Sequence, residues 1–167
     1  MASNTFDIVT AFNKKGYILN YCEKLFEKNN YKEKTLFKDM PERMVFETEI
    51  WMIGAKIRPE IAKMKKDKRS DLLLQEILTI VQTKKYRKGR ESFVMLLHYF
   101  SDIPSIVNVL EILLEDNELY GFAVSELNKL KFYRYTEKIK SLLENEKTGW
   151  IKQELKRNLQ NAWCIYE

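Results

Sequence analysis

The chain has 167 residues, of which 45% are hydrophobic and 32% charged, and its formal net charge is +5. This length corresponds to about one domain with a single extended core, so a second independent unit is not expected. Five glycines and three prolines are too few for a turn-rich β architecture, and the composition also disfavours disorder. Long helices are expected.

The first predicted helix covers residues 17 to about 29, where apolar side chains recur at helical spacing. A second helix begins with Pro41 in its first turn and reaches about Ala55. Gly54 and Pro59 interrupt the helical pattern beyond that point.

The lysine-rich segment 63–69 is predicted to be an exposed helix end or a loop, and Ser70 then caps a helix over residues 71–81. Five further helices are predicted from apolar stripes with spacings of three and four residues. Asp102 caps the second of these, with Pro104 in its first turn. The stripes lie within residues 93–100, 106–114, 123–130, 139–143 and 151–159.

An internal repeat is visible in the second half of the chain. Leu113-Leu114-Glu115 recurs as Leu142-Leu143-Glu144, and the phrase that begins at Gly121 recurs in similar form at Gly149. A weaker copy begins at Gly89. Two-helix units this short must stack side by side to bury their apolar stripes.

Residues 86 to about 160 therefore resemble bacterial HEAT-like repeats. The resemblance implies an all-α fold in which antiparallel helical hairpins form a right-handed α–α superhelix. We expect one domain over 1–167, with HEAT-like repeats over 86–167. Residues 1–85 are then a helical N-terminal cap or degenerate repeats, because terminal repeats are atypical.

Charge is distributed unevenly along the chain. Residues 56–90 contain twelve Lys or Arg against four acidic residues, whereas residues 91–128 contain seven carboxylates and no Lys or Arg. The acidic segment is a candidate binding surface, although solvated helix faces also collect charge without any further role.

No pattern indicates catalysis. His98 is the only histidine, and its place between Leu97 and Tyr99 favours a structural role. The chain has no phosphate-binding glycine loop and no nucleophile near a histidine, so we expect no enzyme activity, no cofactor and no metal site. Carboxylate pairs such as Glu111 and Glu115 lack the further ligands that a metal needs.

Cys22 and Cys164 lack a CxxC spacing and are interpreted as reduced thiols. The chain begins without a signal-peptide pattern, and no apolar run approaches the roughly 20 residues that span a bilayer. A cytoplasmic protein without membrane contact is therefore expected.

The first functional hypothesis is a non-enzymatic protein-binding module. The chain is similar to bacterial immunity proteins that neutralise a toxin domain, including those of contact-dependent growth inhibition. The resemblance implies that an acidic face occludes the basic active-site cleft of the toxin. The expected partner-binding residues are Glu111, Glu115, Asp116, Glu118, Tyr120 and Tyr135. The positive total charge counts against a nuclease target.

Two alternatives remain open. One is a nucleic-acid-binding repeat protein that uses the basic segments 63–69 and 84–90, and the other is a scaffold or adaptor. The candidate basic patch comprises Lys65, Lys66, Lys68, Arg69, Lys84, Lys85, Arg87 and Lys88. Aromatic residues such as those of Phe132-Tyr133-Arg134-Tyr135 are interpreted as packing residues or, alternatively, as a binding hot spot.

Overall fold

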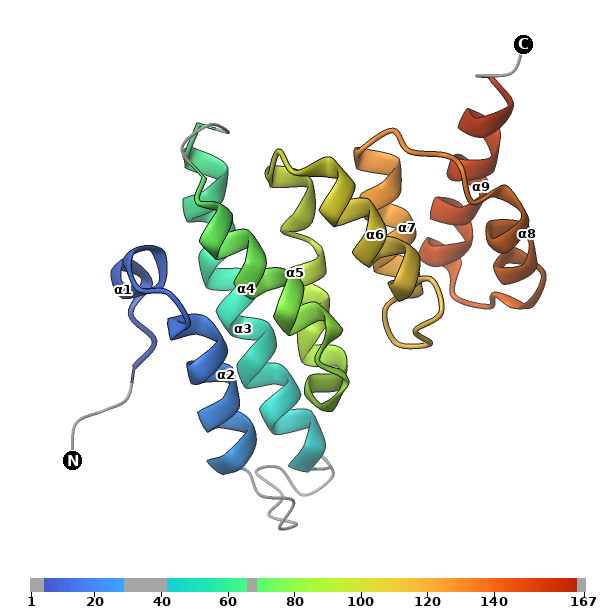
Figure 1. Cartoon of the computed structure of the whole chain (residues 1–167). Helices are drawn as coiled ribbons and strands as arrows, with labels where there is room; N and C mark the ends of the chain where they lie inside the picture. The colour runs from blue at the N-terminus through green and yellow to red at the C-terminus, as the bar shows by residue number, and fades with distance from the viewer. Residues whose placement is uncertain (1–4, 29–41, 66–68, 165–167) are drawn as a thin grey trace. The chain divides into compact units, whose positions relative to one another are not determined.

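The computed structural model describes residues 5–28, 42–65 and 69–164. Throughout these residues the regular structure is helical and no β-strand is present, which confirms the predicted all-α class (Figure 1). Contacts divide the chain into two compact units, Met1–Ser101 and Asp102–Glu167, described separately below. The expected single domain stays a prediction.

The first unit is organised around one long helix, α3. It packs against α2, against the 3-10 segment η2 and against α5. Ile50, Ile53, Ile57 and Ile61 lie three or four residues apart on α3 and are all buried. The elements of this unit are α1 (Ile8–Asn13), α2 (Tyr17–Lys28), α3 (Glu42–Lys63), α4 (Asp71–Gln82), η2 (Lys84–Arg90), α5 (Glu91–Val94) and the 3-10 turn η3 (Leu97–Tyr99).

Helix α3 does not end near Ala55, so the prediction of a break at Gly54 and Pro59 was wrong. A Cβ atom at Gly54 would lie 2.3 Å from the Ser92 hydroxyl oxygen and 3.0 Å from the Ser92 backbone carbon, so this glycine is where α5 approaches α3 closely. Pro59 lies only one turn from the helix end. The isoleucines buried on both sides offset the backbone hydrogen bond that it removes.

A carboxylate on α4 holds the start of α2. Glu76 is buried and accepts hydrogen bonds from the backbone N–H groups of Ile18 (3.1 Å), Leu19 (3.2 Å) and Gly16. The first N–H groups of a helix have no partner within the helix, and the helix dipole favours a negative charge there. Glu76 therefore fastens α2 to α4.

The apolar stripe within residues 93–100 is buried, but these residues do not form one α-helix. Phe93 lies in α5, and the chain then continues through the 3-10 turn η3, with the Tyr99 N–H donating to the Leu96 carbonyl. A stripe with spacings of three and four residues fits a series of 3-10 turns as well as an α-helix, so periodicity alone does not distinguish them.

The second unit contains α6 (Ile103–Leu113), α7 (Tyr120–Lys129), α8 (Thr136–Asn145) and α9 (Gly149–Trp163). Helix α7 packs against both α6 and α9, and α8 packs against α9 (Figure 1). The predicted cap of α6 is confirmed, because the Asp102 carboxylate accepts the Ser105 N–H at 3.3 Å with Pro104 in the first turn.

The repeated phrases occupy equivalent places in the two helix pairs. Gly121 and Gly149 both lie in the first turn of the second helix of their pair, and Leu127 and Leu155, which hold the same position in the two phrases, are both fully buried. The environments of the two glycines differ. A Cβ at Gly121 would lie 2.7 Å from Ile151, whereas one at Gly149 would meet nothing within 4 Å.

A polar network fixes the register between α7 and α9. The Asn128 side-chain amide donates to the Glu154 carbonyl (2.9 Å) and to the Glu154 carboxylate (2.7 Å). The buried Asn158 amide donates in turn to the Asn128 side-chain oxygen at 2.7 Å. Because these hydrogen bonds form in only one alignment of the two helices, they specify how α9 sits on α7.

Candidate functional site

Three of the predicted partner-binding residues lie together on one surface of the second unit. Glu111 is exposed on α6, Glu115 is exposed in the turn that follows this helix, and Tyr135 precedes the first turn of α8. The Tyr135 hydroxyl donates to the Glu111 carboxylate at 3.0 Å, and the Lys138 ammonium group contacts the Glu115 carboxylate at 2.6 Å. We call Glu111, Glu115, Tyr135 and Lys138 the α6–α8 surface.

The carboxylates of this surface remain accessible to a partner although both have contacts. The Glu115 side chain is 71% exposed, and an ion pair this open to solvent contributes only up to about 1 kcal/mol, so Lys138 can exchange for a partner cation. Burial, together with the hydrogen bond to Glu111, raises the pKa of Tyr135, which keeps the hydroxyl protonated and able to donate.

Asp116 and Glu118 lie in the connection between α6 and α7. The Asp116 carboxylate accepts the Glu118 N–H at 2.9 Å, and the Asp116 carbonyl accepts the N–H groups of Leu119 and Tyr120. Asp116 therefore organises the turn that starts α7, a role that Asp favours through local side-chain hydrogen bonds. The spacing of these acidic residues alone does not distinguish this role from partner binding.

Tyr120 has a different neighbourhood from Tyr135. Its hydroxyl donates to the carboxylate of Glu146, which is buried and also accepts the Thr148 N–H at 2.5 Å. Burial and the adjacent carboxylate raise the pKa of Tyr120 to about 12. Tyr120 thus links α7 to the connection between α8 and α9, and it does not contact Glu111 or Glu115 through its hydroxyl.

Two other carboxylates of the acidic segment have structural roles. Glu126 is fully buried and contacts the Lys129 ammonium group at 2.6 Å, and Asp102 caps α6. Fewer carboxylates of the acidic segment are therefore available to a partner than the sequence suggests.

The candidate basic patch is divided between the two ends of α4. Lys65 and Arg69 precede this helix, whereas residues 84–88 follow it. Twelve residues of α-helix extend about 18 Å, so the two groups do not form one compact patch. Lys66 and Lys68 lie outside the described residues.

Several cations of this patch hold the fold together. Arg69 donates to the carbonyls of Ile61 (3.1 Å), Met64 (2.7 Å) and Tyr99, which places it at the C-terminal end of α3. Lys85 contacts Glu23 at 2.6 Å, and Arg87 contacts Glu47 at 3.1 Å. Lys65, Lys84 and Lys88 are exposed.

The structure places the only histidine in a packing environment. The His98 ring lies half-buried against Tyr99, with 4.0 Å between the ring centroids. In the described part of the chain, no three His, Cys, Asp or Glu side chains are grouped so that they could hold a metal ion.

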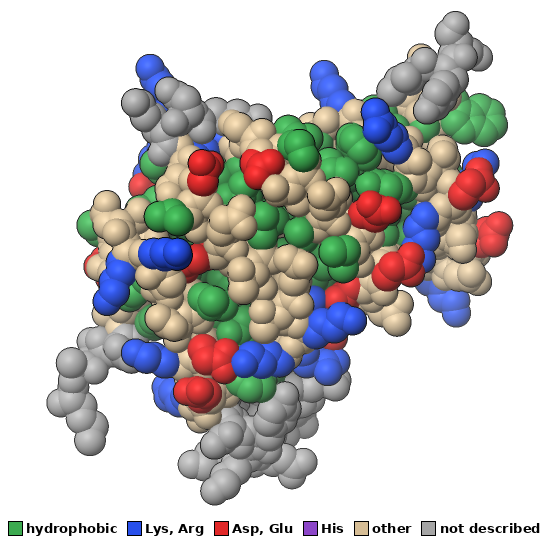
Figure 2. Space-filling view, viewed as in Figure 1, with side chains coloured by type: hydrophobic (Ala, Val, Ile, Leu, Met, Phe, Trp, Pro, Cys, Tyr) green, Lys and Arg blue, Asp and Glu red, His purple; other side chains and the backbone are tan. Residues whose placement is uncertain are grey.

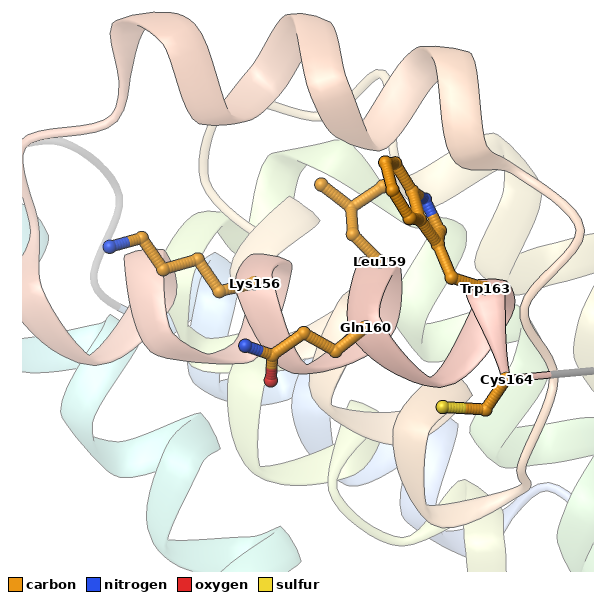
Figure 3. A pocket seen from close by; sticks show the side chains of 5 residues that line it. All are labelled: Lys156, Leu159, Gln160, Trp163 and Cys164. Atoms are coloured by element: carbon orange, nitrogen blue, oxygen red, sulfur yellow. The ribbon is translucent and has the colours of Figure 1, made fainter.

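Sequence reasoning missed an apolar trough on α9. Leu159 and Trp163 lie next to each other there, and Lys156, Gln160 and Cys164 complete the lining (Figure 3). The trough has a volume of about 430 Å³, and Trp163 is 67% exposed. Aromatic residues are usually packed in the core, so no signal in the sequence indicated that Trp163 is exposed. An exposed tryptophan becomes visible only when the neighbours of α9 are known.

Charge on the visible face does not favour either sign. In Figure 2, the Lys and Arg side chains of the described residues lie interspersed with those of Asp and Glu. Local pairing, more than net charge, therefore decides which groups are available to a partner.

Comparison with protein-family models, curated proteins and solved structures finds no significant match to this chain. Among the described helices, none is both long enough and apolar enough to cross a membrane.

Proposed function

We propose that the chain is a non-enzymatic protein-binding module of HEAT-like helical hairpins, and that it acts as an immunity protein. In this proposal it binds a cognate bacterial toxin domain and occludes the active site of that domain. The right-handed superhelical arrangement, the cytoplasmic location and the toxin partner all belong to this proposal.

The supporting observation is the α6–α8 surface. Two carboxylates and a phenol hydroxyl lie together where the end of α6 meets the start of α8, and the carboxylates are exposed. Carboxylates spaced along a helix can replace substrate phosphates in the basic cleft of a nuclease, and electrostatic complementarity of this kind increases both association rate and specificity. Tyr135 adds a large, partly apolar side chain of the kind that dominates interface energetics.

A growth assay tests the toxin-neutralising role. The toxin domain encoded by the gene immediately upstream is expressed with and without this chain, and we expect growth to be restored only when both are present. Reversing the charge at Glu111 and Glu115 together should abolish protection, whereas Glu144→Lys on α8 should not. A neighbouring gene that encodes no secreted toxin domain, or protection that both variants retain, refutes the role.

Nucleic-acid binding is the second candidate, because Lys65, Lys84 and Lys88 are exposed. The division of the basic residues between the ends of α4 weakens it. A mobility-shift titration discriminates the two candidates, since binding through phosphates weakens steeply with salt. If the chain binds no duplex or single strand at low salt, this candidate is eliminated.

A further inference from the structure

One face of α9 is exposed along the whole helix. Five residues of this face are spaced four, three, four and three positions apart in the sequence, so they lie on one line of the helix surface. All of them are exposed. We call this face the α9 stripe; it comprises Gly149, Gln153, Lys156, Gln160 and Trp163.

The equivalent face of α7 already binds a helix within the same unit. In the repeated phrase, Gly121 and Asn128 of α7 are the counterparts of Gly149 and Lys156 of the α9 stripe. Gly121 receives the side chain of Ile151, and Asn128 donates to the carboxylate of Glu154. The helix that packs on α7 therefore presents an apolar residue and, three positions later, an acid.

The α9 stripe differs from its α7 counterpart in charge. Where α7 has the Asn128 amide, α9 has the ammonium group of Lys156, and among the described residues Lys156 forms no ion pair. A second lysine, Lys152, is exposed one turn earlier. A carboxylate that occupied the place of Glu154 on this face would form a charge-assisted hydrogen bond, which is stronger than the neutral one on α7.

The C-terminal part of the α9 stripe supplies an apolar anchor. Figure 3 shows the Leu159 and Trp163 side chains adjacent on α9, beside a trough of about 430 Å³. Tryptophan is among the residues most enriched in binding hot spots, and a partner side chain that covered Trp163 and Leu159 would remove a large apolar area from water.

We propose that the α9 stripe binds an α-helix of a second protein, one that carries a large apolar residue followed three positions later by an acidic residue. A further apolar side chain of that helix enters the trough at Trp163. The proposal rests only on the protein-binding part of the proposed function and is independent of the toxin's identity.

A second copy of this chain fits the α9 stripe less well. Lys156 lies at the midpoint of α9, equally far from Gly149 and Trp163. An antiparallel, two-fold pairing of two stripes would place the two Lys156 side chains against each other, and opposed like charges are unfavourable. An acidic helix from another protein has no such conflict.

The probe is a stapled helical peptide with the sequence of residues 149–163, because α9 itself presents Ile151 and Glu154 at the required spacing. The full chain is titrated with this peptide, and the indole N–H signal of Trp163 is followed by nuclear magnetic resonance. We expect the signal to shift on binding. Lys156→Glu should weaken binding at least tenfold, and a peptide with Glu154→Lys should restore part of the loss.

The matched control is Lys24→Glu, which makes the same charge change at an exposed position of α2 and should leave the affinity unchanged. Trp163→Ala provides a second variant, and circular dichroism checks that each variant is folded. The proposal is overturned if the peptide fails to bind. Equal binding to the parent chain and to Lys156→Glu also overturns the proposal. In that case the peptide, which has the sequence of α9, takes the place of α9 on α7 and does not bind the α9 stripe. Self-association that Lys156→Glu strengthens indicates a second copy as the occupant and overturns it too.

The toxin assay separates this proposal from the proposed function. If the peptide does not bind but the toxin domain is still neutralised, the α9 stripe is eliminated and the immunity role remains. If the peptide binds with the expected charge dependence and no toxin is neutralised, the immunity role is eliminated and binding through the α9 stripe remains.

Discussion

Replacing Glu76 by Gln should loosen the attachment of α2 to α4. The substitution keeps the size of the side chain but removes its charge and converts one acceptor oxygen into a donating NH₂ group. Three backbone N–H groups now point at the Glu76 carboxylate, from Gly16, Ile18 and Leu19. At least one of them would face another donor.

The cost follows from these contacts. A buried donor left without an acceptor costs about 1–3 kcal/mol, and loss of the negative charge at a partly buried helix N-terminus costs about 1 kcal/mol more. We therefore expect Glu76→Gln to lower the free energy of unfolding by about 2–4 kcal/mol. For a unit of this size the loss corresponds to a fall of roughly 10–20 °C in Tm.

Urea unfolding followed by far-ultraviolet circular dichroism measures the loss. Glu60→Gln is the control, because Glu60 forms an exposed ion pair with Lys63 at 2.9 Å and should contribute less than about 1 kcal/mol. A Glu76→Gln protein that unfolds at the same urea concentration as the parent chain would contradict the role of Glu76 at the start of α2.

Three further outcomes are expected. Gly54→Ala should destabilise the chain by about 1–2 kcal/mol through overpacking, whereas Gly149→Ala should be neutral or stabilise it by up to about 1 kcal/mol; equal urea midpoints for the two variants would refute the close approach at Gly54. Burial alone would raise the pKa of Glu146, but hydrogen bonds from Tyr120 and Thr148 outweigh burial and lower this pKa. The Glu146 carboxylate therefore stabilises the fold at pH values above its usual pKa of 4.5, and this stabilisation is lost as the pH falls through the lower pKa of the folded state. Glu146→Gln should therefore reduce the loss of stability on acidification, and an unchanged pH dependence of the urea midpoint would count against the interaction. A thiol reagent should modify exposed Cys164 quickly and leave Cys22 intact until the chain unfolds, since burial raises the pKa of the Cys22 thiol; two equally fast thiols would disprove this.

Local signals in the sequence predicted much of the secondary structure. Ser70 and Asp102 cap α4 and α6 as predicted, because a capping side chain needs only its own neighbours along the chain. Gly54 was misinterpreted for the opposite reason. Its role is to admit a helix from a distant part of the sequence, at Ser92, and no local pattern contains that contact.

The candidate site was predictable only in outline. An acidic segment was visible in the sequence, but the pairing of Glu111 with Tyr135 joins two different helices, and the burial of Glu126 depends on packing in the folded unit. The role of Arg69 also depends on contacts that the sequence does not show. Its charge suggested nucleic-acid binding, but its side chain donates to carbonyl groups at the C-terminal end of α3. Trp163 escaped notice because aromatic residues are usually buried.

Calorimetric titration of the full chain with the toxin domain encoded beside it tests the proposed binding role most directly. We expect a one-to-one complex whose dissociation constant rises at least tenfold when Glu111 and Glu115 are both changed to Lys, a loss of at least about 1.4 kcal/mol. Glu144→Lys should leave the constant unchanged. Absence of a complex, or equal affinity for all three proteins, would contradict protein binding through the α6–α8 surface.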